Sequence, residues 1–303
     1  MINKQVLVYG GSGAQGSAIA QALIKNGHSV KAQTRSEINA DKIKSIGAVP
    51  VYADFENLSS LEEACRECSA IVLTMPLAFD INLAMIWVDN VIKAAQSSSI
   101  NCFVFNASGP IPKSLTGISA LDIKLLVANK LKDSGLPVIT IQPTLYMGNM
   151  TAPWSAPAIV QKSTLAYPLP EQQKVSWISW ESMGEYIAAA VEHPELAGQS
   201  FSIGGSEAIS GIDMADVFSN HMSKPVTYFA VSLSDFEAGL NQALGEPVGT
   251  EISKLYGWFA GEGASRLNID NDEIIKALGI KPNNFKQWVK SIDWHSFVDI
   301  TAA

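Results

Sequence analysis

Three glycines near the start of the chain are spaced to hold a phosphate group through the backbone. Gly10, Gly13 and Gly16 follow an apolar run at residues 5–9 and precede a helical pattern at residues 17–26. The first glycine permits a tight turn, the second lets the backbone approach a pyrophosphate, and the third allows close helix–strand packing. The N-terminus of the following helix adds N–H groups and partial positive charge. The spacing therefore predicts a dinucleotide-binding loop, with a glycine-rich turn that binds nothing as the alternative.

A basic residue ends the second apolar run, where dinucleotide-binding sites select their cofactor. The run at residues 29–33 is followed by Thr34, Arg35 and Ser36. Sites that prefer NAD usually carry Asp or Glu here, which accepts a hydrogen bond from the ribose 2′-hydroxyl. An arginine instead suits the 2′-phosphate of NADP, whose oxygens a guanidinium can bind in pairs. Arg35 thus favours NADP(H), the alternative being a surface arginine in solvent.

An acidic residue follows the third apolar run. Asp54 comes shortly after residues 49–52. Its carboxylate could accept a hydrogen bond from the adenine edge, or it could cap a turn before the next helix. The sequence leaves these two alternatives equal.

A parallel sheet would bring the glycine loop, Arg35 and Asp54 together at the carboxyl ends of its strands, and the sequence predicts such a sheet. Apolar runs typical of buried strands alternate with amphipathic helical patterns. The expected strands span residues 5–9, 29–33, 49–52, 70–75, 102–106 and 138–142, and the expected helices span 17–26, 40–46, 58–68, 82–95 and 119–134. This alternation predicts an α/β fold with a Rossmann-type, doubly wound parallel sheet covered by helices on both faces.

The pattern changes after Asn149, which indicates a second structural unit. Four prolines and few regular signals occur in residues 151–175, a helix and a strand return at 181–192 and 199–203, and helices separated by Gly and Pro follow from about 207. We therefore assign residues 1–150 to an NAD(P)-binding domain, to which 176–205 return. Residues 151–175 and 206–303 are assigned to a smaller, mostly helical substrate or lid lobe.

Composition and charge narrow the class of protein. The chain has 303 residues, of which 47% are hydrophobic and 17% charged, and a formal net charge of -8. This acidity favours solubility, whereas nucleic-acid binding would need a basic patch. We find no apolar run long enough for a membrane span and no signal-peptide pattern, and three cysteines fit a reducing compartment. These features predict a cytoplasmic protein that binds neither nucleic acid nor membranes.

Several segments together resemble the NmrA-like family of atypical short-chain dehydrogenases/reductases. The glycine loop, with Gln15 between its last two glycines, is similar to that family's phosphate loop. Residues 51–54 and 58–64 resemble its third strand and helix, and residues 134–143 and 147–149 its sixth strand and the loop beyond. The resemblance covers roughly residues 4–205. It implies a Rossmann domain that holds NADP(H) at the carboxyl edge of the sheet, and a C-terminal lobe that covers the substrate cleft.

The resemblance also implies roles for individual residues. Met75 and Pro76 would run alongside the adenosine and ribose of the cofactor. The segment 106–108 would lie near the nicotinamide, and Pro143 and Tyr146 would flank the carboxamide of the nicotinamide. The predicted cofactor-binding residues are Gly10, Ser12, Gly13, Ala14, Gln15, Gly16, Arg35, Asp54, Met75, Pro76, Asn106, Ala107, Lys124, Pro143 and Tyr146. The predicted substrate-binding residues are Tyr146, Asn149 and Trp154. For Trp154 the alternative is ordinary packing, because tryptophan gains much on burial.

A lysine on the expected helix at 119–134 is the first candidate catalytic residue. Short-chain dehydrogenases usually carry Tyr-x-x-x-Lys on one helix face, where the ammonium lowers the pKa of the tyrosine that exchanges a proton with the substrate. Counted back from Gly135, Lys124 takes the family's lysine position, but Ala120 stands where the tyrosine would be. By resemblance to members that keep only the lysine, Lys124 would bind the nicotinamide ribose or donate to a developing oxyanion. The alternative is an exposed helix lysine.

Ser108 is the second candidate catalytic residue. It follows the expected strand at 102–106, where the wider superfamily carries its catalytic serine. A serine that forms a turn before Gly109 is an equally good interpretation.

Other reactive side chains give no site. Cys65 and Cys68 form a C-x-x-C at the C-terminal end of an expected helix, where the helix dipole disfavours a thiolate, so we expect no redox role. The four histidines have no metal-ligand spacing, and we predict no metal site.

Two hypotheses of different class follow. The first is an NADPH-dependent reductase that transfers a hydride to a small apolar or aromatic carbonyl, quinone or imine. The second is a non-catalytic NADP(H) sensor that acts through a protein partner, which the alanine at position 120 motivates. A nucleotide-sugar epimerase fits less well, because such enzymes generally use the Tyr-x-x-x-Lys pair. An oligomer is compatible with either hypothesis.

Overall fold

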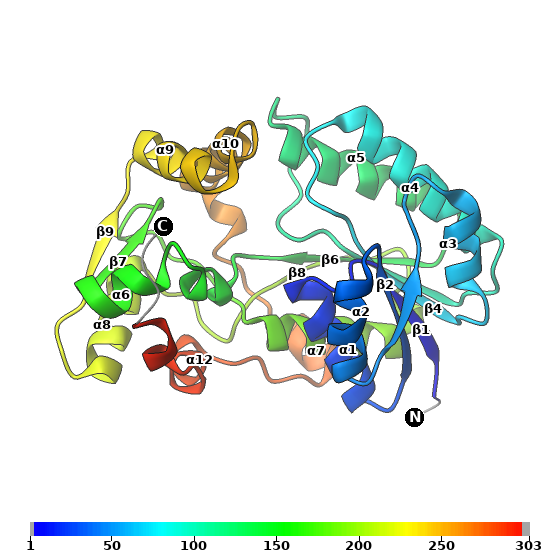
Figure 1. Ribbon diagram of the computed structural model, residues 1–303, viewed down its shortest axis with the longest axis horizontal. Coiled ribbons are helices and arrows are strands. Elements are labelled where there is room, and N and C mark those ends of the chain that lie inside the picture. Colours follow the sequence, from blue (N-terminus) through cyan, green and yellow to red (C-terminus); the bar gives the residue numbers. More distant parts are fainter. Residues whose placement is uncertain (1–2, 299–303) are drawn as a thin grey trace. The chain divides into compact units, whose positions relative to one another are not determined.

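The computed structural model describes residues 3–298, which form two compact units (Figure 1). The first unit contains residues 3–143, 180–203 and 271–281, and the second contains residues 144–179, 204–270 and 282–298. Residues 271–281 belong to the first unit. Their helix α11 (Asp272–Leu278) packs against α7 (Trp180–Glu192), and Asn271 Nδ2 donates to the Tyr186 hydroxyl over 3.1 Å.

Within the described residues, the first unit is built on a sheet of seven parallel strands in the order β3-β2-β1-β4-β5-β6-β8. The strands are β1 (Gln5–Val8), β2 (Ser29–Thr34), β3 (Val49–Tyr52), β4 (Ala70–Thr74), β5 (Cys102–Asn106), β6 (Val138–Pro143) and β8 (Ser200–Ile203). The central strands β4 and β5 are buried at every position, as expected for a sheet covered on both faces. The predicted Rossmann-type fold is confirmed.

Helices cover both faces of this sheet (Figure 1). Alternate side chains of each strand point to opposite faces, so the apolar side chains on each face need a layer of helices to bury them. Phe103 and Phe105 of β5 belong to a core cluster that includes residues of α3, α4 and α5. Cys102, on the opposite face of the same strand, contacts the Ala190 carbonyl of α7, which packs against α1. The helices of this unit, besides α7 and α11, are α1 (Ala14–Lys25), α2 (Glu37–Ser45), α3 (Leu58–Cys65), α4 (Ile81–Gln96), α5 (Ser119–Asp133) and the 3-10 turn η2 (Pro194–Leu196).

The strand order reverses its direction at β1, which opens a crevice beside this strand. Strand β1 pairs with β2 on one side and with β4 on the other, so the chain leaves β1 toward α1 and β2 and later returns to β4. In open α/β sheets, ligands bind in the crevice that such a reversal opens outside the carboxyl ends of the strands. The loop between β1 and α1 holds the three spaced glycines, so the fold brings the predicted phosphate loop to this crevice.

The second unit is mostly helical, as predicted, but it also contains a small sheet that the sequence analysis missed. Strands β7 (Thr164–Tyr167) and β9 (Thr227–Ala230) pair in parallel. Each has only four residues, and β9 is largely exposed, so neither gives the apolar run that marks a buried strand. The other elements are η1 (Met147–Thr151), α6 (Ala156–Lys162), α8 (Gly211–Met222), α9 (Leu233–Leu244), α10 (Val248–Ala260), η3 (Ala264–Arg266), α12 (Phe285–Ser291) and η4 (Trp294–Phe297).

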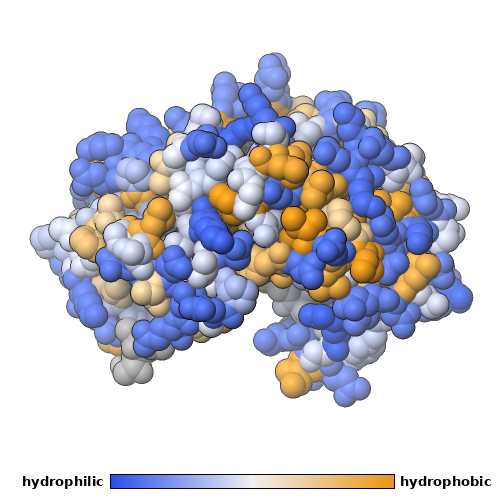
Figure 2. All heavy atoms as spheres, turned by 90° about the horizontal axis from the view of Figure 1, so that it is seen from above, coloured by the Kyte–Doolittle hydropathy of each residue, from blue (hydrophilic) through white to orange (hydrophobic). Residues whose placement is uncertain are grey.

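The molecular surface is predominantly polar on the face shown in Figure 2, with apolar patches between the polar residues. Exposed apolar side chains such as Ile38 and Leu115 are normal for a folded protein. Among the helices of residues 3–298, none combines the length and the apolarity needed to cross a bilayer.

Candidate functional site

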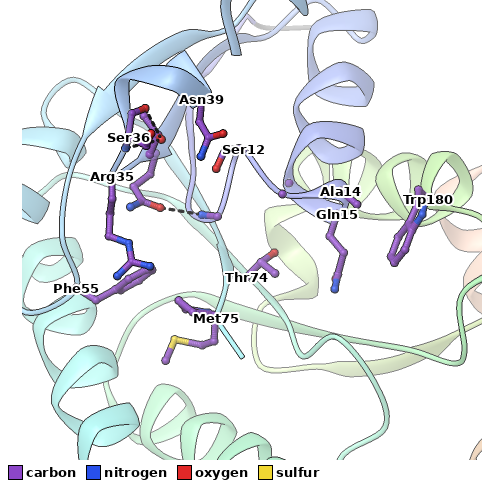
Figure 3. Close-up of a pocket in the computed structure, with 16 residues that line it drawn as sticks. Ser12, Ala14, Gln15, Arg35, Ser36, Asn39, Phe55, Thr74, Met75 and Trp180 are labelled. Carbon is purple, nitrogen blue, oxygen red and sulfur yellow. Dashed lines mark hydrogen bonds between the residues drawn. The ribbon is translucent and has the colours of Figure 1, made fainter. Parts of the chain in front are cut away.

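A cavity of about 460 Å³ lies within the first unit, where the strands β1, β2 and β4 end (Figure 3). Its volume is in the range of about 300–1,000 Å³ that is usual for small-molecule sites. The lining residues come from the glycine loop and the start of α1, from the ends of β2 and β4, from α2, from the segment after β3 and from the first residue of α7. They are Gly10, Ser12, Gly13, Ala14, Gln15, Gly16, Gln33, Thr34, Arg35, Ser36, Asn39, Phe55, Thr74, Met75, Pro76 and Trp180. Nine of the residues predicted to bind the cofactor are therefore brought together.

Two of the three spaced glycines are required by the protein itself. Gly10 has a φ of +72°, a conformation that glycine adopts without strain. A Cβ on Gly16 would lie 2.1 Å from the Gly10 carbonyl oxygen, because α1 starts directly against the loop. Gly10 therefore accounts for the tight turn, and Gly16 accounts for the close packing of the helix against the strand.

Gly13 is different, because nothing in the protein forbids a side chain there. Its φ of -80° and ψ of 168° suit any residue, and an added Cβ would meet only the Gly10 oxygen, at an ordinary 3.5 Å. Gly13 nevertheless lines the cavity. Gly13 lies in a part of the cavity wall that we call the cradle. A glycine that the fold does not need at this place fits the close approach of a pyrophosphate.

The N-terminus of α1 supplies the electrostatics of this cradle. Gly13 is the N-cap of the helix, makes no side-chain cap, and is followed by a first turn without acidic residues. The partial positive charge of the helix end is therefore not neutralised locally, which favours an anion at this point.

A buried glutamine that sequence analysis missed holds the loop to the sheet. Gln33 in β2 accepts a hydrogen bond from the Gly10 backbone N–H over 3.1 Å and donates to the Ala53 carbonyl over 2.6 Å. Its side chain is 4% exposed. A polar residue at an inward position of an apolar run is the signal that could have identified it, since buried amides need partners.

Arg35 lines this cavity together with further polar side chains (Figure 3). It is exposed and takes part in no ion pair within the described part of the chain. Ser36 is the N-cap of α2 but makes no side-chain cap, and Asn39 follows in the first turn. Both line the cavity beside Arg35. Sequence analysis missed them, although their place directly after Arg35 could have indicated a larger polar group.

Asp54 does not line this cavity, and its hydrogen bond supports the turn-capping alternative. Its Oδ1 accepts the Glu56 backbone N–H over 2.9 Å. The neighbouring Phe55, which was not predicted, lines the cavity instead. Its ring packs against Tyr9 and Trp87, with centroids 5.5 and 5.9 Å away, so a buried aromatic cluster supports this part of the wall.

A polar network joins the glycine loop to the ends of β4 and β5. Asn106 Nδ2 donates to Gln15 Oε1 over 2.8 Å and to the Thr74 hydroxyl over 3.2 Å. Ser108 donates from its hydroxyl to the same Gln15 oxygen over 3.0 Å, and from its backbone N–H to Asn106 Oδ1 over 3.1 Å. Ser108 has a φ of +53°, which is uncommon for a residue other than glycine. Asn106 and Ser108, which were predicted to lie near the nicotinamide, are thus tied directly to the glycine loop.

Lys124 is partly buried rather than fully exposed. From α5 it reaches the segment after β5, where its ammonium donates to the Ala107 carbonyl over 2.6 Å. Burial lowers the pKa of this ammonium to about 8, because desolvation disfavours the charged form. A Cβ on Gly109 would lie 3.2 Å from Lys124 Nζ, so the glycine leaves room for the ammonium. Four residues earlier on α5, Ala120 is buried.

The remaining predicted residues, which follow α5 in the chain, belong partly to the first unit and partly to the second. Pro143 ends β6 in the first unit, and Tyr146 forms a bridge with Ile178 in the second. Neither lines the cavity described above. Asn149 and Trp154 line a different cavity, which lies within the second unit.

The C-x-x-C segment has the properties of structural cysteines. Helix α3 ends at Cys65, both thiols are buried, and burial raises the pKa of each, that of Cys68 to about 11. A raised pKa removes the thiolate that redox chemistry needs. Among the described residues, no group of three or more His, Cys, Asp or Glu side chains could hold a metal ion.

Comparisons with known proteins show the family of this chain. The sequence profile of the NmrA-like family matches residues 2–289. An NAD(P)H azoreductase of Xenophilus azovorans is 26% identical over 258 residues, which are 83% of this chain and 86% of the azoreductase.

Two solved structures share the fold. The triphenylmethane reductase of Citrobacter sp., complexed with NADP(H), superposes with a TM-score of 0.78 at 16% identity, over 95% of this chain and 99% of the reductase. An NADPH-dependent quinone oxidoreductase of Escherichia coli, complexed with NADPH, gives 0.76 at 19% identity, over 94% and 99%. At this identity the two structures support the fold alone.

Proposed function

The chain belongs to the NmrA-like family, and on this premise we propose that it is an NADPH-dependent reductase of small, apolar or aromatic acceptors. The acceptor classes are carbonyls, quinones and imines, together with azo compounds, which the azoreductase relative suggests by its name. The observation that carries the proposal is the cradle around Gly13. It is open to a pyrophosphate, and Arg35 stands beside it to take a further phosphate.

The residues of the first unit fit NADP(H) in two separate ways. The backbone of the glycine loop and the N-terminus of α1 would hold the pyrophosphate. Arg35, Ser36 and Asn39 would bind the 2′-phosphate, because they offer a guanidinium and neutral polar groups, and no carboxylate is among the described residues that line the cavity. When bound, NADPH supplies a hydride to the acceptor.

Lys124 would stabilise the charge that forms on the acceptor and supply a proton to it. An acceptor that takes up a hydride develops negative charge on its oxygen or nitrogen, and a nearby ammonium stabilises that charge and can deliver a proton. The Lys124 ammonium is held by the Ala107 carbonyl and, with a pKa of about 8, is both charged and readily deprotonated near neutral pH. Ser108 and Asn106 would position the loop through Gln15 rather than react themselves.

The Arg35→Ala variant tests the cofactor preference. Loss of charge-assisted hydrogen bonds to a phosphate costs about 1.5–3 kcal/mol, so the Kd for NADPH should rise about tenfold to a hundredfold. The Kd for NADH should not change, because NADH has no 2′-phosphate. Calorimetric titration with both nucleotides measures this.

The matched control for that variant is Arg66→Ala. Arg66 is also exposed, and within residues 3–298 its side chain makes one ion pair, with Glu63, outside the cavity. Its removal should leave both nucleotide affinities unchanged. An Arg35→Ala variant that binds NADPH as tightly as the wild type would contradict the assigned preference.

Turnover tests the reductase itself. Oxidation of NADPH should be followed by its absorbance with a naphthoquinone, an aromatic aldehyde and an azo dye as acceptors. Consumption of NADPH that depends on one of these acceptors supports the proposal. Tight NADPH binding without turnover of any acceptor would favour the non-catalytic sensor instead.

A further inference from the structure

The peptide unit between Ala107 and Ser108 lies between two polar side chains of the first unit. Its carbonyl accepts a hydrogen bond from the Lys124 ammonium over 2.6 Å, and its N–H donates to Asn106 Oδ1 over 3.1 Å. In a trans peptide these two groups point in opposite directions, so Asn106 and Lys124 bind the same peptide unit from opposite sides. The direction in which Asn106 turns the N–H therefore sets the direction in which the carbonyl meets the ammonium.

Regular secondary structure does not account for the conformation of this peptide unit. Strand β5 ends at Asn106, and the Ala107 N–H still donates to the Ile141 carbonyl of β6 over 2.9 Å. The next residue, Ser108, has a φ of +53°, which is strained for a residue with a Cβ. An asparagine that accepts the N–H two residues further on stabilises such a turn. Asn106 is thus the side chain that holds the peptide unit in place.

The Asn106 amide can take only one orientation. A backbone N–H can only donate, so the amide atom that faces Ser108 is the oxygen. The amide nitrogen then donates to Gln15 Oε1 over 2.8 Å and to the Thr74 hydroxyl over 3.2 Å. Asn106 is 1% exposed, so bulk water has little access to these bonds. The partners of Asn106 therefore fix which way its oxygen points.

The Lys124 ammonium depends on the carbonyl of this peptide unit. Within residues 3–298 the ammonium makes one hydrogen bond, to Ala107, and no ion pair. Asp122, the carboxylate closest to it along α5, accepts instead from the backbone N–H groups of Thr116 and Gly117. If the carbonyl turned away, the ammonium would either stay buried without an acceptor or move into solvent.

We propose that Asn106 is a positioning residue for Lys124: by binding the N–H of the Ala107–Ser108 peptide, its side chain turns the Ala107 carbonyl toward the ammonium. Because the same amide binds Gln15, it also joins the ammonium to the glycine loop. This inference rests on the proposed function, and it gives Asn106 an effect on Lys124 that acts through the backbone.

The experiment compares Asn106→Ala with Asn106→Ser. The two new side chains are of nearly equal size and both lose the bond to Gln15, but a serine hydroxyl can still accept the N–H two residues further on. The pKa of Lys124 is measured by NMR titration of the full chain labelled with 13C-lysine, and Lys124→Met identifies the resonance by its absence. The pKa should stay near about 8 in Asn106→Ser.

In Asn106→Ala the pKa of Lys124 should move by about one pH unit or more. It falls if the ammonium stays buried without its acceptor, and it rises toward the ordinary 10.5 if the ammonium moves into solvent. Should the alanine variant not fold, Asn106→Val and Asn106→Thr repeat the comparison with side chains that suit a strand. Asn101→Ala is the control, because Asn101 is exposed and lies just before the other end of β5. It should leave the pKa unchanged.

Steady-state kinetics gives a second readout. The kcat should fall about tenfold to a hundredfold in Asn106→Ala, the cost of a small displacement of a reacting group, and less in Asn106→Ser. The Kd for NADPH should change equally in the two variants, because both lose the same bond to Gln15.

The NMR titration separates this inference from the proposed function. A pKa of Lys124 that moves in Asn106→Ala but not in Asn106→Ser, in a protein that reduces no acceptor, would keep the positioning role and reject the reductase. A pKa that is unchanged in both variants, or that moves equally in both, would overturn the positioning role, and turnover by the wild type would then leave the reductase standing.

Discussion

Replacing Lys124 with methionine is expected to lower turnover of the acceptor by about a hundredfold to a thousandfold, the usual cost of removing one donor that faces a developing oxyanion. Methionine keeps the length of the side chain and loses only the ammonium. The change removes the donor held by the Ala107 carbonyl, while the glycine loop and Arg35 are untouched. Steady-state kinetics should therefore show a loss in kcat, and the Kd for NADPH should change little.

Lys132→Met is the control for this variant. Lys132 lies on the same helix α5 but is exposed. Its replacement should leave kcat unchanged. If Lys124→Met turns over as fast as the wild type, the assigned role is wrong, and a water or Ser108 would have to supply the proton.

The pKa of Lys124 adds a dependence on pH to the same prediction. Activity that needs the ammonium should fall as the pH rises through about 8, and not near the ordinary lysine value of 10.5, because burial lowers the pKa. An Arg at this position stays charged at all working pH values, so Lys124→Arg should retain activity to higher pH. A pH–rate profile of the two proteins measures the difference.

Stability should follow the opposite trend. Between about 8 and 10.5 the unfolded chain binds more protons at Lys124 than the folded chain does. The free energy of unfolding therefore rises with pH in this window, and below it the buried charge costs its full amount. The Tm of Lys124→Met should exceed that of the wild type most at neutral pH, with the difference shrinking toward alkaline pH. A difference that does not change with pH would contradict this.

Replacing Gly13 with valine is expected to raise the Kd for NADPH by about a hundredfold or more, through loss of charge-assisted contacts worth about 1.5–3 kcal/mol each. The side chain would occupy the space that a pyrophosphate needs at the start of α1. The protein itself should tolerate it, because Gly13 has ordinary dihedral angles and an added Cβ meets only one atom, at 3.5 Å. The cost to helix capping is about 1 kcal/mol, so the Tm should fall only slightly.

Gly16→Ala gives the contrast that makes this test specific. Its Cβ would lie 2.1 Å from the Gly10 oxygen, so the loop must move and the Tm should fall together with NADPH binding. Calorimetry and thermal unfolding of both variants separate the two roles. Unchanged NADPH binding by Gly13→Val would mean that the cradle holds no pyrophosphate, and the proposed cofactor would be lost with it.

Most of the first unit could be predicted from the sequence, because its signals are local. The strands at residues 49–52 and 102–106 are marked by short apolar runs, and they have the predicted bounds. Gly10 is required by its positive φ and Gly16 by its contact with Gly10 in the same seven-residue loop, so their spacing alone indicates the turn. The small sheet of β7 and β9 could not be predicted. Each of its strands has only four residues, and each is stabilised by pairing with a strand that is distant in the sequence.

Contacts between distant segments account for what sequence analysis missed. Gln33 acts on the glycine loop from the next strand, and Phe55 joins a cluster with Tyr9 and Trp87. The substrate-side prediction named Asn149 and Trp154 but not the residues of β7, α9 and α10 that line the same cavity. No local pattern relates these segments.

By itself, then, the sequence determined the doubly wound sheet and the glycine-rich turn, and Arg35 gave the expectation of NADP(H), since periodicity, glycine spacing and residue type act over a few neighbouring positions. Only the tertiary structure decided that Gln15, Asn106 and Ser108 meet, that the Lys124 ammonium is partly desolvated, and that Asn106 and this ammonium bind the same peptide unit. The physical reason is that burial and hydrogen bonding depend on which surfaces the folded chain brings together, and the spacing along the chain does not record that.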